Sequence, residues 1–220
     1  MALVSGFLIG FEVYLPDWTQ GILGMKASMA GFAITPSSLM WIVGSFISGK
    51  LLGKLRPNQI INISLSLILI GAIVMVMLPA YTPFWSFLLI SAICGTGFGI
   101  TVTSTTIIVQ NQVEENQIGV ATSFNTLCRT LGQSLMISVF GIIMNSSMLR
   151  GVRQTDGATM GMMNKLINPP QTANQLASNM LPKLRMVLYH TLHNIFLVAL
   201  GLIILAFIFN FTDRLSKKNN

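Results

Sequence analysis

Charged side chains are scarce in this sequence. Asp, Glu, Lys and Arg together make up 9% of its 220 residues, against about 25% in an average soluble domain, whereas hydrophobic residues make up 52%. The mean hydropathy is correspondingly high, at +0.70. This composition excludes an ordinary soluble domain and indicates a protein that crosses the bilayer several times.

Signatures of catalysis and of metal binding are missing as well. The sequence contains no H-E-x-x-H, G-x-S-x-G or P-loop lysine motif. Its two cysteines, Cys94 and Cys128, both fall inside apolar stretches, so no disulfide framework is predicted. His190 and His193 form an H-x-x-H pair, but no further ligand lies near them in the sequence. We therefore expect no metal, no cofactor and no enzymatic activity.

The basic residues exceed the acidic ones, 13 against 6, but they are not gathered into a patch interleaved with aromatic residues. Nucleic acid is therefore not an expected partner. Instead three bases lie in the connection at residues 50–56 and three at the C-terminus. Five more lie in residues 146–185, a loop long enough to be translocated largely regardless of its charge. Under the positive-inside rule, this distribution places both termini and the 50–56 connection in the cytoplasm of a multi-pass protein of the plasma membrane.

Six apolar stretches are long enough to cross a bilayer, which takes about 20 residues each. They are residues 2–23, 30–52, 59–78, 84–109, 118–145 and 186–211. Residues 146–185 form a long extracellular loop between the last two, and residues 212–220 form a short cytoplasmic tail. The sequence therefore predicts an all-α integral membrane protein with six transmembrane helices.

The fifth stretch, residues 118–145, carries one charged side chain, Arg129. Three- and four-residue steps place a set of polar residues on one helical face: Thr122, Asn125, Arg129 and Gln133. A second face is apolar: Phe124, Leu127, Leu131 and Leu135. Arg129 lies roughly 16 Å into the helix, near mid-membrane, where a guanidinium costs at least about 2.5 kcal/mol unless it meets water or a partner. We expect the polar face to line a cavity; helix packing is the alternative.

The first stretch carries Glu12, the only carboxylate placed deep in hydrocarbon. Glu12, Pro16 and Gln20 share one face at four-residue spacing, and Pro16 predicts a kink. Desolvation disfavours the charge of such an acid, which suits proton coupling. A structural ion pair, with Arg129 for example, is the alternative. Gln20 is expected to line the cavity.

Three further features predict helix contacts or bends. Pro36 interrupts the second stretch, as in helices that line transporter sites, although a packing kink is equally common. Gly95, Gly97 and Gly99 in the fourth stretch suit either a gate helix or static close packing. The basic connection contains a set of glycines and cations, and we expect its glycines to allow close helix approach: Gly49, Gly53, Lys54 and Arg56.

Residues 119–134, GVATSFNTLCRTLGQS, resemble the penultimate helix of the fourteen-span drug:proton antiporter branch of the major facilitator superfamily, the EmrB/QacA type. The long loop before the last stretch and the run from Tyr14 to Pro36 are also similar to that branch. Residues 49–57 resemble the superfamily's cytoplasmic loop motif, with Gly53 where the family has an aspartate. The resemblance covers nearly the whole chain, but only as a C-terminal six-helix half.

This resemblance implies one bundle made of two inverted three-helix repeats, with the first, second, fourth and fifth helices around a cavity and the third and sixth facing lipid. It also implies export of small lipophilic drugs in exchange for protons, Glu12 as the proton-linked carboxylate, and an N-terminal six- or eight-helix half from the same gene or a separate chain. Two alternatives stay open: an inactive truncated remnant, and a membrane receptor or assembly protein acting through the outer loop.

Overall fold

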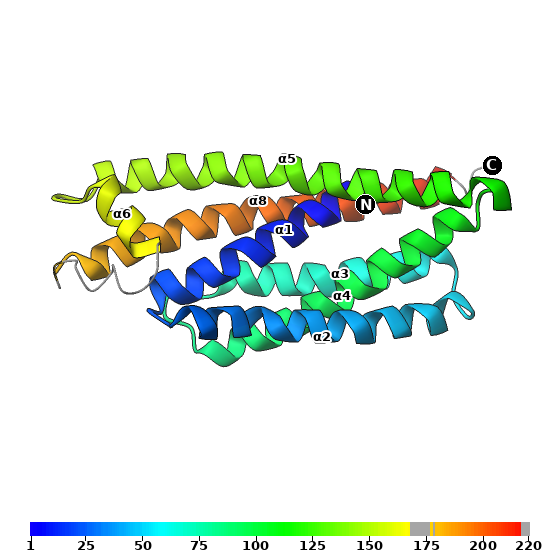
Figure 1. The fold of residues 1–220 in the computed structure, drawn as a ribbon, viewed down its shortest axis with the longest axis horizontal. Coiled ribbons are helices and arrows are strands. Elements are labelled where there is room, and N and C mark those ends of the chain that lie inside the picture. Colours follow the sequence, from blue (N-terminus) through cyan, green and yellow to red (C-terminus); the bar gives the residue numbers. More distant parts are fainter. Residues whose placement is uncertain (168–176, 178, 217–220) are drawn as a thin grey trace.

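The computed structural model describes residues 1–167, 177 and 179–216, and its regular elements are helices throughout (Figure 1). In chain order they are α1 (Ala2–Asp17), the π-helix η1 (Trp18–Ile22), α2 (Ala27–Leu52), α3 (Pro57–Met77), α4 (Phe84–Gln110), the 3₁₀ turn η2 (Glu115–Gln117), α5 (Ile118–Arg153), α6 (Met160–Ile167) and α8 (Leu181–Ser216).

Five helices in the described part of the chain are long and apolar enough to cross a membrane, whereas the sequence predicts six. The difference lies at the first predicted stretch, where α1 is only 16 residues long and passes into η1. Pro16 has no N–H, so the backbone carbonyl of Glu12 loses its helical partner just before the helix widens at Trp18. The regular helix is therefore shorter than the apolar stretch.

The predicted boundaries also shift around the long loop. α5 continues to Arg153, past the expected end at residue 145, and α8 begins at Leu181, before residue 186. Helix α6 lies between them, whereas residues 168–176 and 178 are outside the described part. At the C-terminus α8 runs to Ser216, so the predicted tail begins as helix, and residues 217–220 lie outside the description. Helices α5 and α8 are thus longer than the apolar stretches that predicted them.

Helices α1 and α5 run parallel, in a register set by glycines. Gly132 of α5 lies against the backbone of Ala2, Gly6 of α1 against Met136, and Gly10 against Phe140. Each contact lies four residues after the previous one in both helices, which shows that α1 and α5 run in the same direction. α1 therefore begins alongside the middle of α5, not at the end of the bundle (Figure 1).

Helices α2 and α4 form a second close pair. Gly95 and Gly99 of α4 lie directly on the backbones of Ser37 and Trp41 in α2. Hydroxyl groups bond across the same contact: the Ser91 hydroxyl donates to the Ala33 carbonyl (2.6 Å), the Thr103 hydroxyl donates to the Ser45 hydroxyl (3.0 Å), and the hydroxyls of Ser48 and Ser104 lie 2.7 Å apart. Such small and hydroxyl-bearing contacts are typical of helices packed within a membrane.

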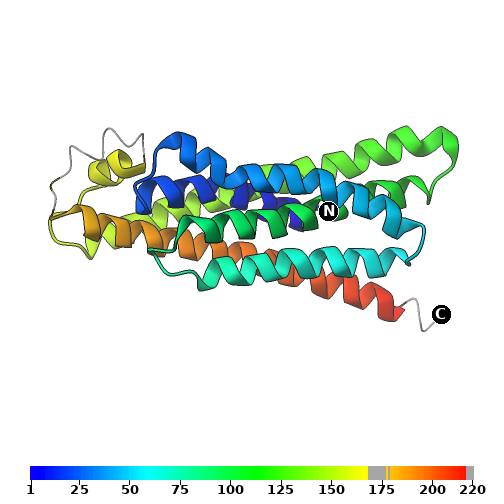
Figure 2. The same ribbon diagram turned by 90° about the horizontal axis from the view of Figure 1, so that it is seen from below.

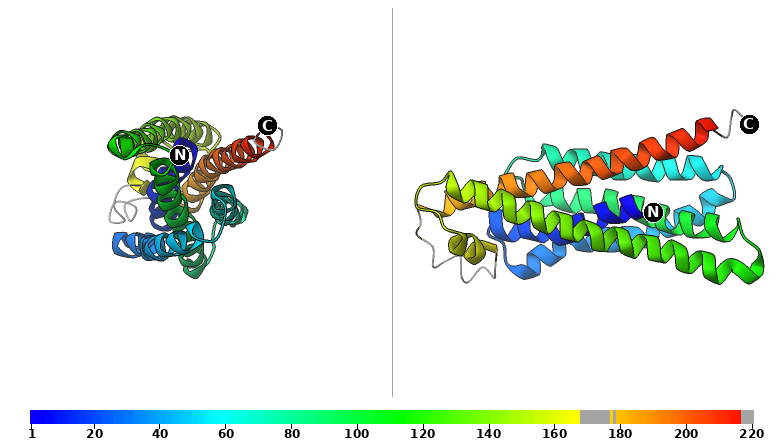
Figure 3. Two further views of the ribbon diagram at one scale, coloured as in Figure 1. Left: turned by 90° about the vertical axis from the view of Figure 1, so that its right-hand side faces the viewer. Right: turned by 90° about the horizontal axis from the view of Figure 1, so that it is seen from above.

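The remaining helices complete one bundle. Seen end-on, α2 and α5 lie on one side, α3 and α8 on the other, and α1 and α4 lie between them (Figure 3). Aromatic side chains of α1 and α4 fill the centre; the rings of Phe7 and Phe11 both contact that of Phe98. The 50–56 and 111–117 connections lie at one end with the end of α8, and α6 lies at the other (Figure 2).

Candidate functional site

The polar face of α5 is directed inward and is bonded to α4. Asn125 is only 8% exposed, and its side-chain amide donates to the Thr106 hydroxyl at 3.2 Å. One turn away, the Gln110 amide donates to the Thr122 hydroxyl at 3.0 Å. Thr122 and Asn125 therefore both join α5 to α4, and these hydrogen bonds favour the packing role that the sequence left as an alternative.

The apolar face of α5 is exposed along its length. Phe124 is 66% and Leu135 67% exposed, and Leu127 and Leu131 are each more than half exposed. The division between a polar and an apolar face, expected from the spacing alone, is thus present in the helix.

Arg129 is half-buried on the inward face and is poorly satisfied. Its Nε is buried without a hydrogen-bond partner in the described part of the chain. Gln133, one turn further on, is also half-buried. Because α5 runs to Arg153, its midpoint falls near Leu135, and Arg129 lies about 10 Å from that midpoint toward the Ile118 end. A buried guanidinium nitrogen left unpaired is costly, which favours access to water or to a partner.

Glu12 lies on the least packed face of α1, with Val13, Pro16 and Gln20 on the same side. Within the described residues no hydrogen bond or ion pair holds its carboxylate. Because Gly10 meets Phe140, Glu12 is level with residue 142 of α5, about 20 Å along the bundle from Arg129. The ion pair between Glu12 and Arg129, given above as an alternative, is therefore wrong.

The proline and glycine candidates have distinct surroundings. Pro36 lies inside an α2 that continues through it to Leu52, whereas Pro16 is the second-last residue of α1, two positions before the π-helix begins at Trp18. On α4, Gly95 and Gly99 face α2, and Gly97 faces Ile68 of α3. A side chain at any of these three positions would overlap the neighbouring helix, which explains why glycine occupies them.

The basic connection does not bring helices close together. A side chain at Gly49 would meet open space, and one at Gly53 would make only an ordinary contact with its own turn. The expectation that these glycines allow close approach is therefore wrong. Lys54 and Arg56 are exposed, and the backbone N–H of Arg56 donates to the Gln59 side chain at 3.1 Å, which caps α3 just before Pro57.

A cleft of about 690 Å³ lies between the end of α5 and the beginning of α8, away from all of the predicted cavity-lining residues. His190 lines it, whereas His193 is half-buried beside the ring of Tyr189. No cluster of three metal-ligating side chains occurs in the part of the chain that is described. Sequence reasoning missed this cleft because its two walls are separated by the long loop.

The sequence of this chain is similar to sequences of known transporters. A sequence model of the Major Facilitator Superfamily matches residues 1–137. Multidrug transporter protein MdtP of Bacillus subtilis (strain 168) is 24% identical over 241 residues, covering 97% of this chain and 44% of that protein. Multidrug efflux pump SdrM of Staphylococcus aureus (strain N315) is 31% identical over 139 residues, covering 62% and 30%.

A tetracycline resistance determinant of Streptomyces rimosus is 29% identical over 147 residues, covering 63% of this chain and 42% of that protein. The chain thus spans less than half the length of these relatives.

Proposed function

This chain belongs to the Major Facilitator Superfamily, and on that premise we propose that it forms the second six-helix half of a transporter that exports lipophilic compounds in exchange for protons. The observation that carries the proposal is the match of 97% of the chain to 44% of a multidrug transporter. We assign it to the fourteen-span branch on the resemblance of residues 119–134 described above.

The sixth crossing in this proposal is α1 together with η1. The two elements run without a break from Ala2 to Ile22 and span roughly 30 Å, the thickness of a hydrocarbon core. Gln20 lies in the π-helical turn that follows Pro16. π-Helical turns of this kind occur frequently at functional sites.

Glu12 is the proposed site of proton coupling. It is half-buried, has no partner among the described residues and lies far from Arg129 along the bundle. A carboxylate so placed can take up and release a proton without breaking a structural ion pair. Arg129 and Gln133 then contribute polar groups on the α5 side of the path, and Thr122 and Asn125 position α5 against α4.

The partner half is proposed to dock on α2 and α5, which flank the bundle on one side (Figure 3). α2 exposes Phe32, Leu39 and Phe46 there, and α5 exposes the apolar face described above. Large contiguous apolar surfaces mark contact with lipid or with another protein. In this arrangement the basic 50–56 connection and the end of α8 lie in the cytoplasm.

A dye-efflux assay tests the proposal. Cells express the chain alone or with a complementary first half, either one encoded beside it or the corresponding half of MdtP. We expect efflux driven by a pH gradient only when both halves are present, and a loss of at least tenfold with Glu12→Gln. Glu115→Gln, an exposed acid in η2, is the matched control and should leave efflux unchanged.

Efflux that needs neither the first half nor Glu12 would overturn the mechanism. If both halves are inserted in the membrane and no dye is exported, the remnant alternative is supported.

A further inference from the structure

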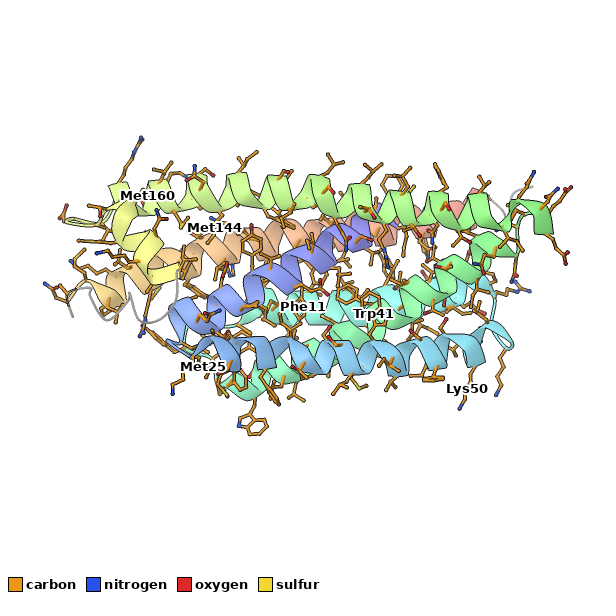
Figure 4. All side chains as sticks on the ribbon, viewed as in Figure 1. Phe11, Met25, Trp41, Lys50, Met144 and Met160 are labelled. Atoms are coloured by element: carbon orange, nitrogen blue, oxygen red, sulfur yellow. The ribbon has the colours of Figure 1, made fainter. Side chains whose placement is uncertain are left out.

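The cleft between α5 and α8 lies at the end of the bundle that holds α6, opposite Lys50 (Figure 4). Its walls come from the last turns of α5 and the first turns of α8. Both helices carry exposed residues there, so the cleft opens to the side of the bundle, not into its core. It is separate from the proposed transport path, because Glu12 and the polar face of α5 do not line it.

The lining of the cleft carries two cations. Arg150 enters from α5 and Lys183 from α8, against a single acid, Asp156. No ion pair neutralises Arg150 or Lys183 within the described residues. Guanidinium and ammonium groups on facing helices, with only one carboxylate in the lining, favour an anionic ligand.

Hydrogen-bond donors converge on the floor of the same cleft. The Ser147 hydroxyl accepts bonds from the Arg150 guanidinium and from the Asn194 amide, both at 3.4 Å. The Arg150 Nε also donates to the Ser146 carbonyl at 3.4 Å. All of these bonds are long, and the guanidinium has five N–H donors, so three of them stay free for a ligand. The Asn194 amide likewise keeps a second N–H. An oxyanion with several acceptor oxygens matches this set.

The groove becomes apolar toward the middle of the bundle. Ile143, two turns before Arg150 on the same line of α5, is half-buried, and Leu197, less than one turn beyond Asn194 on α8, is 44% exposed. Met186, within the cleft, is also exposed. A ligand that fits this surface has an anionic head and an apolar body.

We infer that the α5–α8 cleft binds the phosphate of an anionic phospholipid, with Arg150 and Lys183 on the phosphate and the acyl chains along Ile143 and Leu197. A free phosphate shares the head-group chemistry but cannot use the apolar part of the groove. Basic pockets between transmembrane helices bind lipid head groups in this way. The inference requires that the chain lies in a membrane, but it is independent of transport.

Isothermal titration calorimetry on the purified full chain in a nonionic detergent tests this inference. The ligands are dihexanoylphosphatidylglycerol, dihexanoylphosphatidylcholine and inorganic phosphate. We expect the anionic lipid to bind at least tenfold more tightly than the zwitterionic one and at least a hundredfold more tightly than phosphate. Arg150→Gln with Lys183→Gln should weaken phosphatidylglycerol binding at least tenfold.

The matched control is Arg153→Gln with Lys26→Gln, which removes an arginine and a lysine that are exposed and do not line the cleft. It should change the affinity less than twofold. His190→Glu places a negative charge at an exposed position in the cleft, and it should weaken phosphatidylglycerol binding as the double variant does. This single substitution tests the site if the double variant fails to fold.

Equal affinity for the two lipids, equal loss in the control, or no loss in either cleft variant would overturn the site. Phosphate binding as tight as that of phosphatidylglycerol would overturn the lipid assignment.

Discussion

Glu12 and Arg129 lie on parallel helices but about 20 Å apart along the bundle, because Gly10 is level with Phe140 and Ala2 with Gly132. Neither side chain can neutralise the other. Each therefore depends on its own surroundings, and both are only half-buried. In the proposed mechanism the proton site, Glu12, is distinct from the cationic part of the path at Arg129, and this separation meets that requirement.

The separation predicts that the two residues contribute independently to stability. In a double-mutant cycle with Glu12→Gln and Arg129→Gln, the effects on the free energy of unfolding in mixed micelles should add to within about 0.5 kcal/mol. A coupling above about 1 kcal/mol would mean that the two side chains meet.

Substitutions at Asn125 and Thr106, by contrast, should have effects on the free energy of unfolding that do not add. Their 3.2 Å hydrogen bond joins α5 to α4 at a site where Asn125 is almost fully buried. In the corresponding cycle with Asn125→Ala and Thr106→Val, we expect a coupling of at least about 0.6 kcal/mol, the average for hydrogen bonds between membrane helices, and at most about 1.7 kcal/mol. Thr130→Val, an exposed hydroxyl on the same helix, should show no coupling to Asn125.

The backbone contact of α4 with α2 predicts a steep cost for any side chain at Gly95. A methyl group there overlaps the Ser37 backbone, so Gly95→Ala should lower the free energy of unfolding by about 1–3 kcal/mol. Gly201→Ala in α8 is the control, because nothing lies near that position. It should be neutral or stabilising by up to about 1 kcal/mol, since alanine favours helix. Equal effects at the two sites would contradict the close packing.

Periodicity predicted the two faces of α5 because a regular helix converts three- and four-residue spacing directly into a face. The family resemblance supplied the class of protein, which the match to residues 1–137 supports. The faces of α5 could be predicted because they depend only on local sequence, and the class of protein because it depends on likeness to known sequences.

Contacts between distant segments could not be predicted in the same way. The register of α1 on α5 follows from the contacts of Gly6 and Gly10 with side chains of α5 and of Gly132 with the backbone of Ala2, and no spacing within either helix specifies it. The α5–α8 cleft likewise needs two helix ends that the long loop separates in sequence. The extension of α5 to Arg153 was missed because hydropathy marks where apolar residues end, not where the helix does.

Water access to the polar face of α5 is the measurement that tests the account most directly. Cysteine is placed singly at Gln133 and at Leu131 in a chain carrying Cys128→Ser, with the fully buried Cys94 retained. The chain is expressed with its first half in cells and treated with a membrane-impermeant thiol reagent. We predict at least tenfold faster labelling at position 133 than at 131, and slower labelling at 133 when a transported dye is present. Equal labelling at the two positions, or faster labelling at 131, would contradict a path along this face.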